Sequence, residues 1–365
     1  MTTAPVALPA LVGELSLHQH VSGLLQALST PLGVGPAARV LGRCHDLFLA
    51  ESCDYPAGGL PPRRSALNID GTPVQIGFTL GGRGSRLQFL GEVGAAVMSN
   101  AERLATARGR LRDAAGLLGA EGSLGEVEPA VDELAPPADR ELSAEHAGAI
   151  WLGAGCGPEG SLNVKLYCNA RWGEQGGRWQ RLEAVVVRLG AGFEWPRLRA
   201  LEDEGLEPLG AALSVARGIA GRIYLSGFGI DWDRLGALAG RFSGSKFANQ
   251  VSRFGARLLG AEYNCPARSV VCSFGISAGG LADVKIELCA HCAFGSDLEA
   301  REGCARWLCD DQLAAERYSH AIDILSPGGP NAARVVLHSH VGVGSRDERT
   351  FYFNPCGGAL QDGTD

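Results

Sequence analysis

Two side chains able to bind an anion and to face a cation stand two residues apart in the stretch 161-SLNVKLYCNAR-171. The stretch alternates polar and apolar residues, which is the pattern of a β-strand with two different faces. Lys165 and Tyr167 share the polar face, whereas Leu166 and Cys168 share the apolar one. A polar face of this kind either looks at solvent or lines a chamber.

The same arrangement recurs on other predicted strands. A single Lys-x-Tyr is most often a solvated strand face, so it is the repetition that favours a chamber. In the strand before the last one, three polar residues also share a face: Arg334, His338 and His340. The other inward-facing candidates are Arg86, Arg222 with Tyr224, Lys285 with Glu287, and Tyr352.

Several cations in one chamber are costly unless an anion neutralises them, because each buried charge loses its hydration. A diphosphate fits this need, with Arg as a bidentate donor and Lys as a point charge. The interleaved tyrosines add hydroxyl donors and ring faces that stabilise a cation. A site for an anion beside a developing cation is what ionisation of an allylic diphosphate requires.

The chain contains a repeated unit that would build such a chamber. Five regions each resemble two strands joined by a Gly-rich or charged turn, and they recur about every 60 to 75 residues. About ten antiparallel strands tend to close, because closure removes exposed edges. We therefore predict an α+β fold, a ten-stranded antiparallel β-barrel surrounded by helices, with the polar strand faces inside. The expected hairpins cover 73–91, 148–171, 208–227, 269–291 and 333–355, and the expected helices 93–119, 177–203, 231–259 (two helices, the first capped by Asp231) and 297–325 (capped by Asp297).

The whole chain, residues 1–365, is expected to form a single domain. Residues 1–65 are interpreted as a helical lead-in, and 121–142 as an acidic, Pro-rich connector. The net charge of −7 and the lack of a basic block argue against a nucleic-acid partner. No apolar run is long enough for a membrane span, and the N-terminus lacks the basic region of a signal peptide. With eleven scattered cysteines, we expect a cytoplasmic protein with reduced thiols, monomeric or homodimeric.

The order of these motifs resembles the ABBA-fold aromatic prenyltransferases. Within that family it is most similar to the dimethylallyltryptophan-synthase branch, particularly the bacterial indole prenyltransferases. The resemblance covers about residues 65–356 and depends on the hairpin–helix repeat, with Lys-x-Tyr on one strand and Arg-x-Tyr on a later one. It implies dimethylallyl diphosphate and an aromatic acceptor as the small-molecule substrates, with no cofactor and no essential metal.

The resemblance also implies roles for individual residues. Tyrosines would shield the allyl cation, and an indole such as tryptophan would be the acceptor. Glu287 stands where the family more often has an uncharged partner. The implied diphosphate-binding residues are Arg86, Lys165, Tyr167, Arg222, Tyr224, Lys285 and Tyr352; the implied catalytic residues are Gln75, Tyr167, Tyr224 and Tyr352; the acceptor pocket would hold Gln75, Glu287, His338, His340 and Arg334.

One departure from the family pattern concerns the residue that meets the acceptor. The family's TPxE carries a glutamate that bonds the indole N–H, whereas 72-TPVQIGF-78 places Gln75 there. Gln can accept this hydrogen bond but cannot remove a proton at neutral pH. The final deprotonation would then fall to released diphosphate, water, His338 or His340.

Three other patterns lead to simpler interpretations. The run 153-GAGCGPEG-160 imitates a dinucleotide fingerprint, but the returning strand after it indicates a hairpin turn. The acidic stretch 310-DDQLAAE-316 is similar to the metal-binding motifs of terpene enzymes. It lacks their spacing and lies on the polar face of a predicted helix, so we expect it to be solvated. The stretch 289-CAHC-292, with Cys304 and Cys309, offers zinc ligands, but a continuing strand would point Cys289 and Cys292 to opposite faces, so no metal site is expected.

Two alternatives to indole prenylation stay open at this point. One is a barrel that binds an aromatic or phosphorylated ligand without chemistry, with Gln75 and Glu287 marking a decayed site. The other is a prenyltransferase that acts on a phenolic or phenazine acceptor.

Overall fold

The strands close into a single antiparallel barrel, as the sequence predicts. The computed structural model describes residues 15–82, 84–136, 150–157, 160–215, 221–227, 230–260 and 269–356. Each strand pairs with its neighbours in chain order, and β1 closes the sheet by pairing with β10. The strands are β1 (Val74–Gly81), β2 (Arg86–Glu92), β3 (Ile150–Cys156), β4 (Leu162–Asn169), β5 (Leu206–Val215), β6 (Gly221–Gly227), β7 (Val270–Ser277), β8 (Gly280–Cys289), β9 (His338–Gly344) and β10 (Glu348–Phe353).

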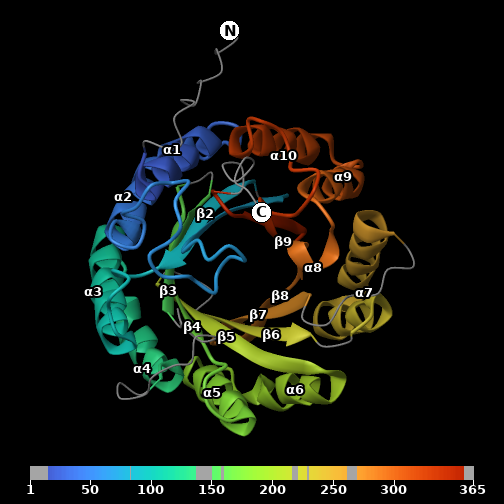
Figure 1. Cartoon of the computed structure of the whole chain (residues 1–365). Helices are drawn as coiled ribbons and strands as arrows, with labels where there is room; N and C mark the ends of the chain where they lie inside the picture. The colour runs from blue at the N-terminus through green and yellow to red at the C-terminus, as the bar shows by residue number, and fades with distance from the viewer. Residues whose placement is uncertain are drawn as a thin grey trace.

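Helices surround the barrel as an outer ring, which Figure 1 shows in a view along the barrel. The first and last helices of the ring, α1 and α10, lie side by side, as β1 and β10 do within the sheet. Among the described helices, none has the length and apolar character needed to cross a lipid bilayer. The helices are α1 (Leu17–Ser29), α2 (Gly35–Leu49), α3 (Asn100–Leu118), α4 (Leu124–Leu134), α5 (Gln175–Arg188), α6 (Trp195–Arg199), α7 (Trp232–Leu259), α8 (Ala290–Ala293), α9 (Asp297–Leu308) and α10 (Gln312–Leu325), with short 3₁₀ turns η1 (Glu121–Ser123), η3 (Gly192–Glu194) and η4 (Ala200–Glu204).

The hydrophobic core is the layer between the barrel wall and this ring. Successive strand residues point to opposite faces, so the apolar set of each strand turns outward against the helices. On β1 the outward residues Ile76 and Phe78 are fully buried, and on β4 the same holds for Val164 and Leu166. The polar set is left to face the interior.

Helix boundaries differ from the sequence expectation in four places. The expected helix 93–119 begins only at Asn100, because Ser99 caps it by accepting from the Glu102 N–H. The expected connector 121–142 contains η1 and α4 over its first part, while 137–142 lie outside the described residues. The expected helix 177–203 is divided, because α5 ends before Gly190, whose φ of 79° is left-handed. The expected helix 297–325 is two helices, since Asp311 caps the start of α10 by accepting from the Ala314 N–H. The expected division of 231–259 is confirmed: α7 kinks at Gly244, where φ is 82°, and Asp231 caps its start.

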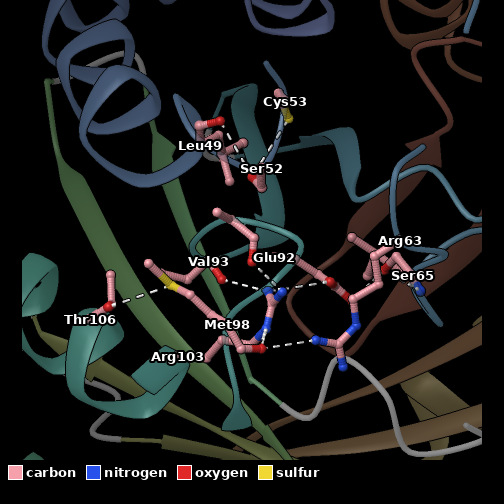
Figure 2. A network of polar contacts seen from close by, with 12 residues as sticks. Leu49, Ser52, Cys53, Arg63, Ser65, Glu92, Val93, Met98, Arg103 and Thr106 are labelled. Atoms are coloured by element: carbon pink, nitrogen blue, oxygen red, sulfur yellow. Dashed lines mark hydrogen bonds and ion pairs between the residues drawn. The ribbon is translucent and has the colours of Figure 1, made fainter. Parts of the chain in front are cut away.

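A buried arginine fixes α3 to the end of β2. The guanidinium of Arg103 donates to the backbone oxygens of Val93 (2.7 Å), Ala95 (2.6 Å) and Met98 (3.3 Å). Figure 2 shows this cluster with Glu92, which accepts a 2.7 Å hydrogen bond from Ser65. Polar contacts thus join the end of β2, the start of α3 and the segment after α2, at the point where the chain leaves the barrel wall.

The last hairpin starts later than expected because its lead-in is held by an aspartate. Ser296, rather than Asp297, caps α9 by accepting from the Glu299 N–H. The carboxylate of Asp297 is fully buried and accepts from the backbone N–H groups of residues 336–338 and from the ring of His338 at 2.9 Å. Burial alone would raise the pKa of Asp297, but these donors outweigh it and lower the pKa. Strand β9 therefore begins at His338.

Candidate functional site

Glycines on neighbouring strands make room for the large inward side chains. In this register several of these side chains lie directly across the sheet from a glycine, although Tyr167 lies across from Trp151 and Ala212 instead. A Cβ on Gly77 would lie 2.7 Å from the Tyr352 ring, and a Cβ on Gly342 would lie 2.7 Å from the Glu287 side chain. The abundant glycine of this chain therefore has a structural use inside the barrel. The pairs are Gly77 with Tyr352, Gly153 with Lys165, Gly210 with Tyr224, Gly275 with Arg222 and Asp283, Gly342 with Glu287, and Gly344 with Lys285.

One half of the interior forms a cavity of about 470 Å³ lined by cations, which we call the cationic cavity. Arg86, Lys165 and Arg346 line it, together with Gln88 and Tyr167. It lies at the end of the barrel where the hairpins turn, because its other lining residues, Gly157, Ser161 and Ser277 among them, come from strand ends at those turns. Arg86 is half exposed there and pairs with Glu348 at 3.6 Å.

A further cation, Arg222, lies deeper in the barrel and is paired with a carboxylate. Arg222 pairs with Asp283 and donates to the Ser273 hydroxyl at 3.0 Å. Arg346 approaches the same aspartate at 3.5 Å, so one carboxylate serves two guanidinium groups. Burial would raise the pKa of Asp283, but Arg222 outweighs this and lowers it. The carboxylate therefore stays ionised and holds Arg222 in place.

Lys165 is the cation whose charge is least compensated. Burial lowers its pKa to about 8, and the nearby positive charges of Arg222 and Lys285 act in the same direction. An anion that enters this part of the barrel would reverse that electrostatic effect. The position of Lys165 thus favours a strongly negative ligand.

A layer of tyrosines separates the cationic cavity from the other half of the barrel. Tyr167 lines both halves, and its ring centroid lies 6.2 Å from that of Tyr224. Tyr352 accepts a 3.2 Å hydrogen bond from Lys285, whose ammonium lies 4.9 Å from the Tyr352 ring centroid. Burial raises the pKa of Tyr167 and Tyr352, so both hydroxyls are protonated donors at neutral pH. Their ring faces are available to a cation in the space between the cavities.

The second cavity, of about 430 Å³, is more apolar, and we call it the glutamine cavity. Leu90, Trp151 and Val271 supply apolar wall, while Gln75 supplies a polar group. The segment between α2 and β1 crosses this end of the barrel (Figure 1) and contributes Leu67 to the wall. Such a space suits a flat aromatic ring with one polar edge.

Gln75 is oriented so that its amide oxygen faces the cavity. Its Nε2 lies 2.7 Å from the Leu67 carbonyl oxygen, 3.1 Å from Asn68 Oδ1 and 2.7 Å from the Ser339 hydroxyl. The Leu67 carbonyl can only accept, which fixes the nitrogen on that side. Within the described part of the chain, Oε1 has no hydrogen-bond partner. A glutamate here would face the Leu67 carbonyl with a negative charge, which accounts physically for glutamine at this position.

Glu287 and His340 add ionisable groups to the same cavity. Glu287 pairs with Lys285 at 2.6 Å; burial would raise its pKa, but Lys285 and His340 outweigh burial and lower it. Burial lowers the pKa of His340 to about 4, so its ring is neutral at physiological pH. The ring bonds the Ser339 hydroxyl through Nδ1 at 3.0 Å. The cavity therefore holds an ionised carboxylate and a neutral imidazole.

Two residues that the sequence placed in this pocket lie elsewhere. The side chain of His338 points outward, where it bonds Asp297 and the Tyr318 hydroxyl at 2.9 Å each. The cause is an irregularity in the β9–β10 register, which pairs Tyr352 with His340 but Phe353 with His338. Arg334 is exposed in the segment before β9. The prediction that Arg334, His338 and His340 share an inward face is therefore wrong for the first two.

Several interior residues were missed by sequence reasoning, Asp283 and Arg346 among them. Asp283 shares its strand face with Lys285 and Glu287, so the period-two pattern already contained the signal. Arg346 lies in the turn between β9 and β10, where no periodicity identifies the direction of a side chain. The other predicted residues, from Arg86 to Tyr352, lie inside the barrel as expected.

Comparisons with known proteins establish this fold. No protein-family model and no curated protein sequence matches the chain. Among solved structures, a 6-dimethylallyltryptophan synthase from Micromonospora olivasterospora, in complex with DMASPP and Trp, superposes with a TM-score of 0.79 at 21% identity over 94% of this chain and 98% of that one. A 5-dimethylallyltryptophan synthase from Streptomyces coelicolor gives 0.77 at 18% identity over 94% and 99%, and the prenyltransferase PriB with product diphosphate gives 0.78 at 19% over 94% and 97%. The chain thus has the prenyltransferase barrel fold that the sequence resemblance predicts.

The glycine pairing predicts that Gly77→Ala destabilises the protein. The new Cβ would overlap the Tyr352 ring and lie 3.1 Å from the Phe351 carbonyl, so ring and strand must both shift, at a cost of about 1 to 3 kcal/mol. The matched control is Gly109→Ala in α3, where no atom lies within 4 Å and helix propensity gives a gain of about 0.5 to 1 kcal/mol. Denaturant unfolding of both variants measures the difference. A Gly77→Ala variant as stable as the wild type would contradict the packing argument.

The pKa of Lys165 predicts that diphosphate binding depends on pH. In the free protein this lysine loses its proton as the pH rises through about 8, and a bound anion raises its pKa. Binding of inorganic diphosphate should therefore take up a proton near pH 8.5, and it should weaken by up to about tenfold per pH unit above pH 8. Titration calorimetry in two buffers of different ionisation enthalpy measures the uptake. The Lys165→Arg variant keeps its charge at this pH and should lose the proton uptake that Lys165 causes. Equal proton uptake in both proteins would refute the assignment of the uptake to Lys165.

Proposed function

We propose that the protein transfers a dimethylallyl group from dimethylallyl diphosphate to an indole such as tryptophan. The observation that carries the proposal is the pair of adjoining cavities, one lined by cations and one by an apolar wall with the Gln75 oxygen, with tyrosines between them. The fold neighbours that are dimethylallyltryptophan synthases support the same substrates. A barrel built only to bind one small ligand would need neither the second cavity nor the tyrosine layer.

The diphosphate binds in the cationic cavity. Arg86, Lys165 and Arg346 meet it directly, and Arg222 reaches it from its pair with Asp283. These cations stabilise the charge that develops on the leaving diphosphate as the allylic C–O bond breaks. They supply this charge from the protein itself, and we propose that the transfer needs no metal ion.

The allyl cation forms in the tyrosine layer. Tyr167, Tyr224 and Tyr352 shield it from water and offer ring faces to its positive charge. Exclusion of water is essential, because water would otherwise capture the cation and give the free alcohol. The acceptor ring then attacks from the glutamine cavity, and a C–C or N–C bond forms to the allyl carbon.

The acceptor is oriented by Gln75. Its Oε1 accepts the indole N–H, which directs electron density into the ring and fixes the ring against the allyl group. The proton displaced from the ring goes to a base inside the barrel. Of the bases expected, released diphosphate, water and His340 remain available, whereas His338 is excluded by its outward position. Glu287 adds an ionised carboxylate.

A mass-spectrometric assay tests the proposed activity. Dimethylallyl diphosphate is offered with tryptophan, simple indoles, a naphthol and a phenazine, with EDTA present. We expect one dimethylallyl unit to be added to an indole despite EDTA, and Lys165→Ala or Arg222→Ala to lower transfer by about 100-fold or more, because each removes a charge that meets the leaving group. The control is Arg301→Ala, which changes a partly exposed arginine on the outer helix α9 and leaves the barrel interior intact. Unchanged transfer in both interior variants would overturn the proposal, and a product only with the naphthol or phenazine would replace the acceptor class.

The role of Gln75 is tested by removing the proposed hydrogen bond first from the protein, by substitution, and then from the acceptor, by N-methylation. In Gln75→Leu, transfer to tryptophan should fall by about tenfold, because a buried N–H loses its acceptor. Transfer to 1-methyltryptophan, which has no indole N–H, should be affected much less by the same substitution. General damage to the cavity would lower both acceptors equally, and that result would remove the hydrogen bond from the account.

A further inference from the structure

A cluster of three metal-ligating side chains lies at the end of β8, apart from the cations and tyrosines. The stretch 289-CAHC-292 would be split between two faces if the strand continued. Instead β8 ends at Cys289, and the single helical turn α8 follows at once. A helical turn brings residues i and i+3 to the same side, so Cys292 returns towards Cys289. The expected separation of Cys289 and Cys292 on opposite strand faces depended on a continuing strand, which the structure does not have here.

The donor atoms of the cluster are spaced as ligands of one ion. Cys289 Sγ lies 3.1 Å from His291 Nδ1 and 3.4 Å from its Nε2. One donor atom from each of Cys289, His291 and Cys292 lies within 4.8 Å of the others. Tetrahedral zinc, with Zn–S and Zn–N bonds of about 2.3 and 2.1 Å, places sulfur and nitrogen donors about 3.6 Å apart. The side chains therefore need only small rotations to share an ion.

The chemistry of the donors also matches a borderline divalent ion. Two thiolates and an imidazole are ligands that select zinc over magnesium or calcium.

The other two cysteines that the sequence offers as zinc ligands lie outside the cluster. Cys304 is buried in α9, and Cys309 is exposed, with its sulfur near Arg257 and Asp310. The cluster is thus a three-ligand set. Cys289 and His291 line the glutamine cavity, and His291 is exposed, so an ion has a path from solvent.

We propose that Cys289, His291 and Cys292 bind one zinc ion at the rim of the glutamine cavity. Three protein ligands leave the fourth coordination position open to water or to a donor atom of a bound molecule. The proposal does not depend on prenyl transfer, since the ligands lie outside the cationic cavity and the tyrosine layer.

Cobalt substitution of the full-length chain tests the site. The protein is reduced, stripped with a chelator, and titrated with Co²⁺ without substrates under anaerobic conditions. We expect thiolate-to-cobalt charge transfer and tetrahedral d–d bands that saturate at one Co²⁺ per chain and disappear on addition of one Zn²⁺. Cys292→Ser and His291→Ala should each weaken binding by about 100-fold or more, since each removes one of three ligands.

The control is Cys309→Ser, which removes an exposed thiol outside the cluster and should leave the titration unchanged. Thermal unfolding of the metal-free variants shows whether each is folded, and His291→Ala provides an exposed position where folding is not at risk. Absence of a charge-transfer band in the wild type, or an equal band in Cys292→Ser, would overturn the proposal. So would a reduced protein that binds no metal while Cys289 and Cys292 form a disulfide on exposure to air.

Discussion

The interior of this barrel holds more positive charge than its own carboxylates neutralise. Arg86, Lys165, Arg222, Lys285 and Arg346 share Asp283, Glu287 and Glu348. Arg222 and Lys285 have little access to bulk water inside the closed sheet, so the imbalance is costly and appears as the lowered pKa of Lys165. Under the proposed function, the rest of the structure keeps these cations in place until the diphosphate enters.

Closure of the sheet makes this arrangement possible. Because β1 pairs with β10, no strand edge is left to bind another chain, and every strand has one face in the interior. Large side chains on one strand fit because glycines stand opposite them on the next, as Gly77 does for Tyr352. The tyrosines then divide the enclosed space into two cavities of similar volume and different polarity. Under the proposed function, one closed sheet keeps a charged leaving group and a flat acceptor apart while holding them close enough to react.

Much of this was predictable from the sequence because strands have a strict period of two. Lys165 and Tyr167 share a face in any strand that contains them, and the repetition of this pattern in successive hairpins identified the barrel. The predictions failed where the period is interrupted. A register irregularity turned His338 outward, a helical turn after Cys289 brought Cys292 back, and Arg346 lies in a turn. Helix breaks at Gly190 and Asp311 depend on local capping, which a hydrophobic pattern does not encode. The orientation of Gln75 depends on hydrogen bonds to Leu67, in the segment before β1, and to Ser339 on β9. No local sequence pattern predicts that these residues meet.

The most direct test of this account is a crystal structure with a non-reactive thiolodiphosphate analogue of the donor and tryptophan bound together. The account predicts the diphosphate in the cationic cavity within hydrogen-bond reach of Lys165 and Arg222, the dimethylallyl group between Tyr167, Tyr224 and Tyr352, and the indole N–H on Gln75 Oε1. A diphosphate bound outside the barrel, or an indole that turns its N–H away from Gln75, would contradict it.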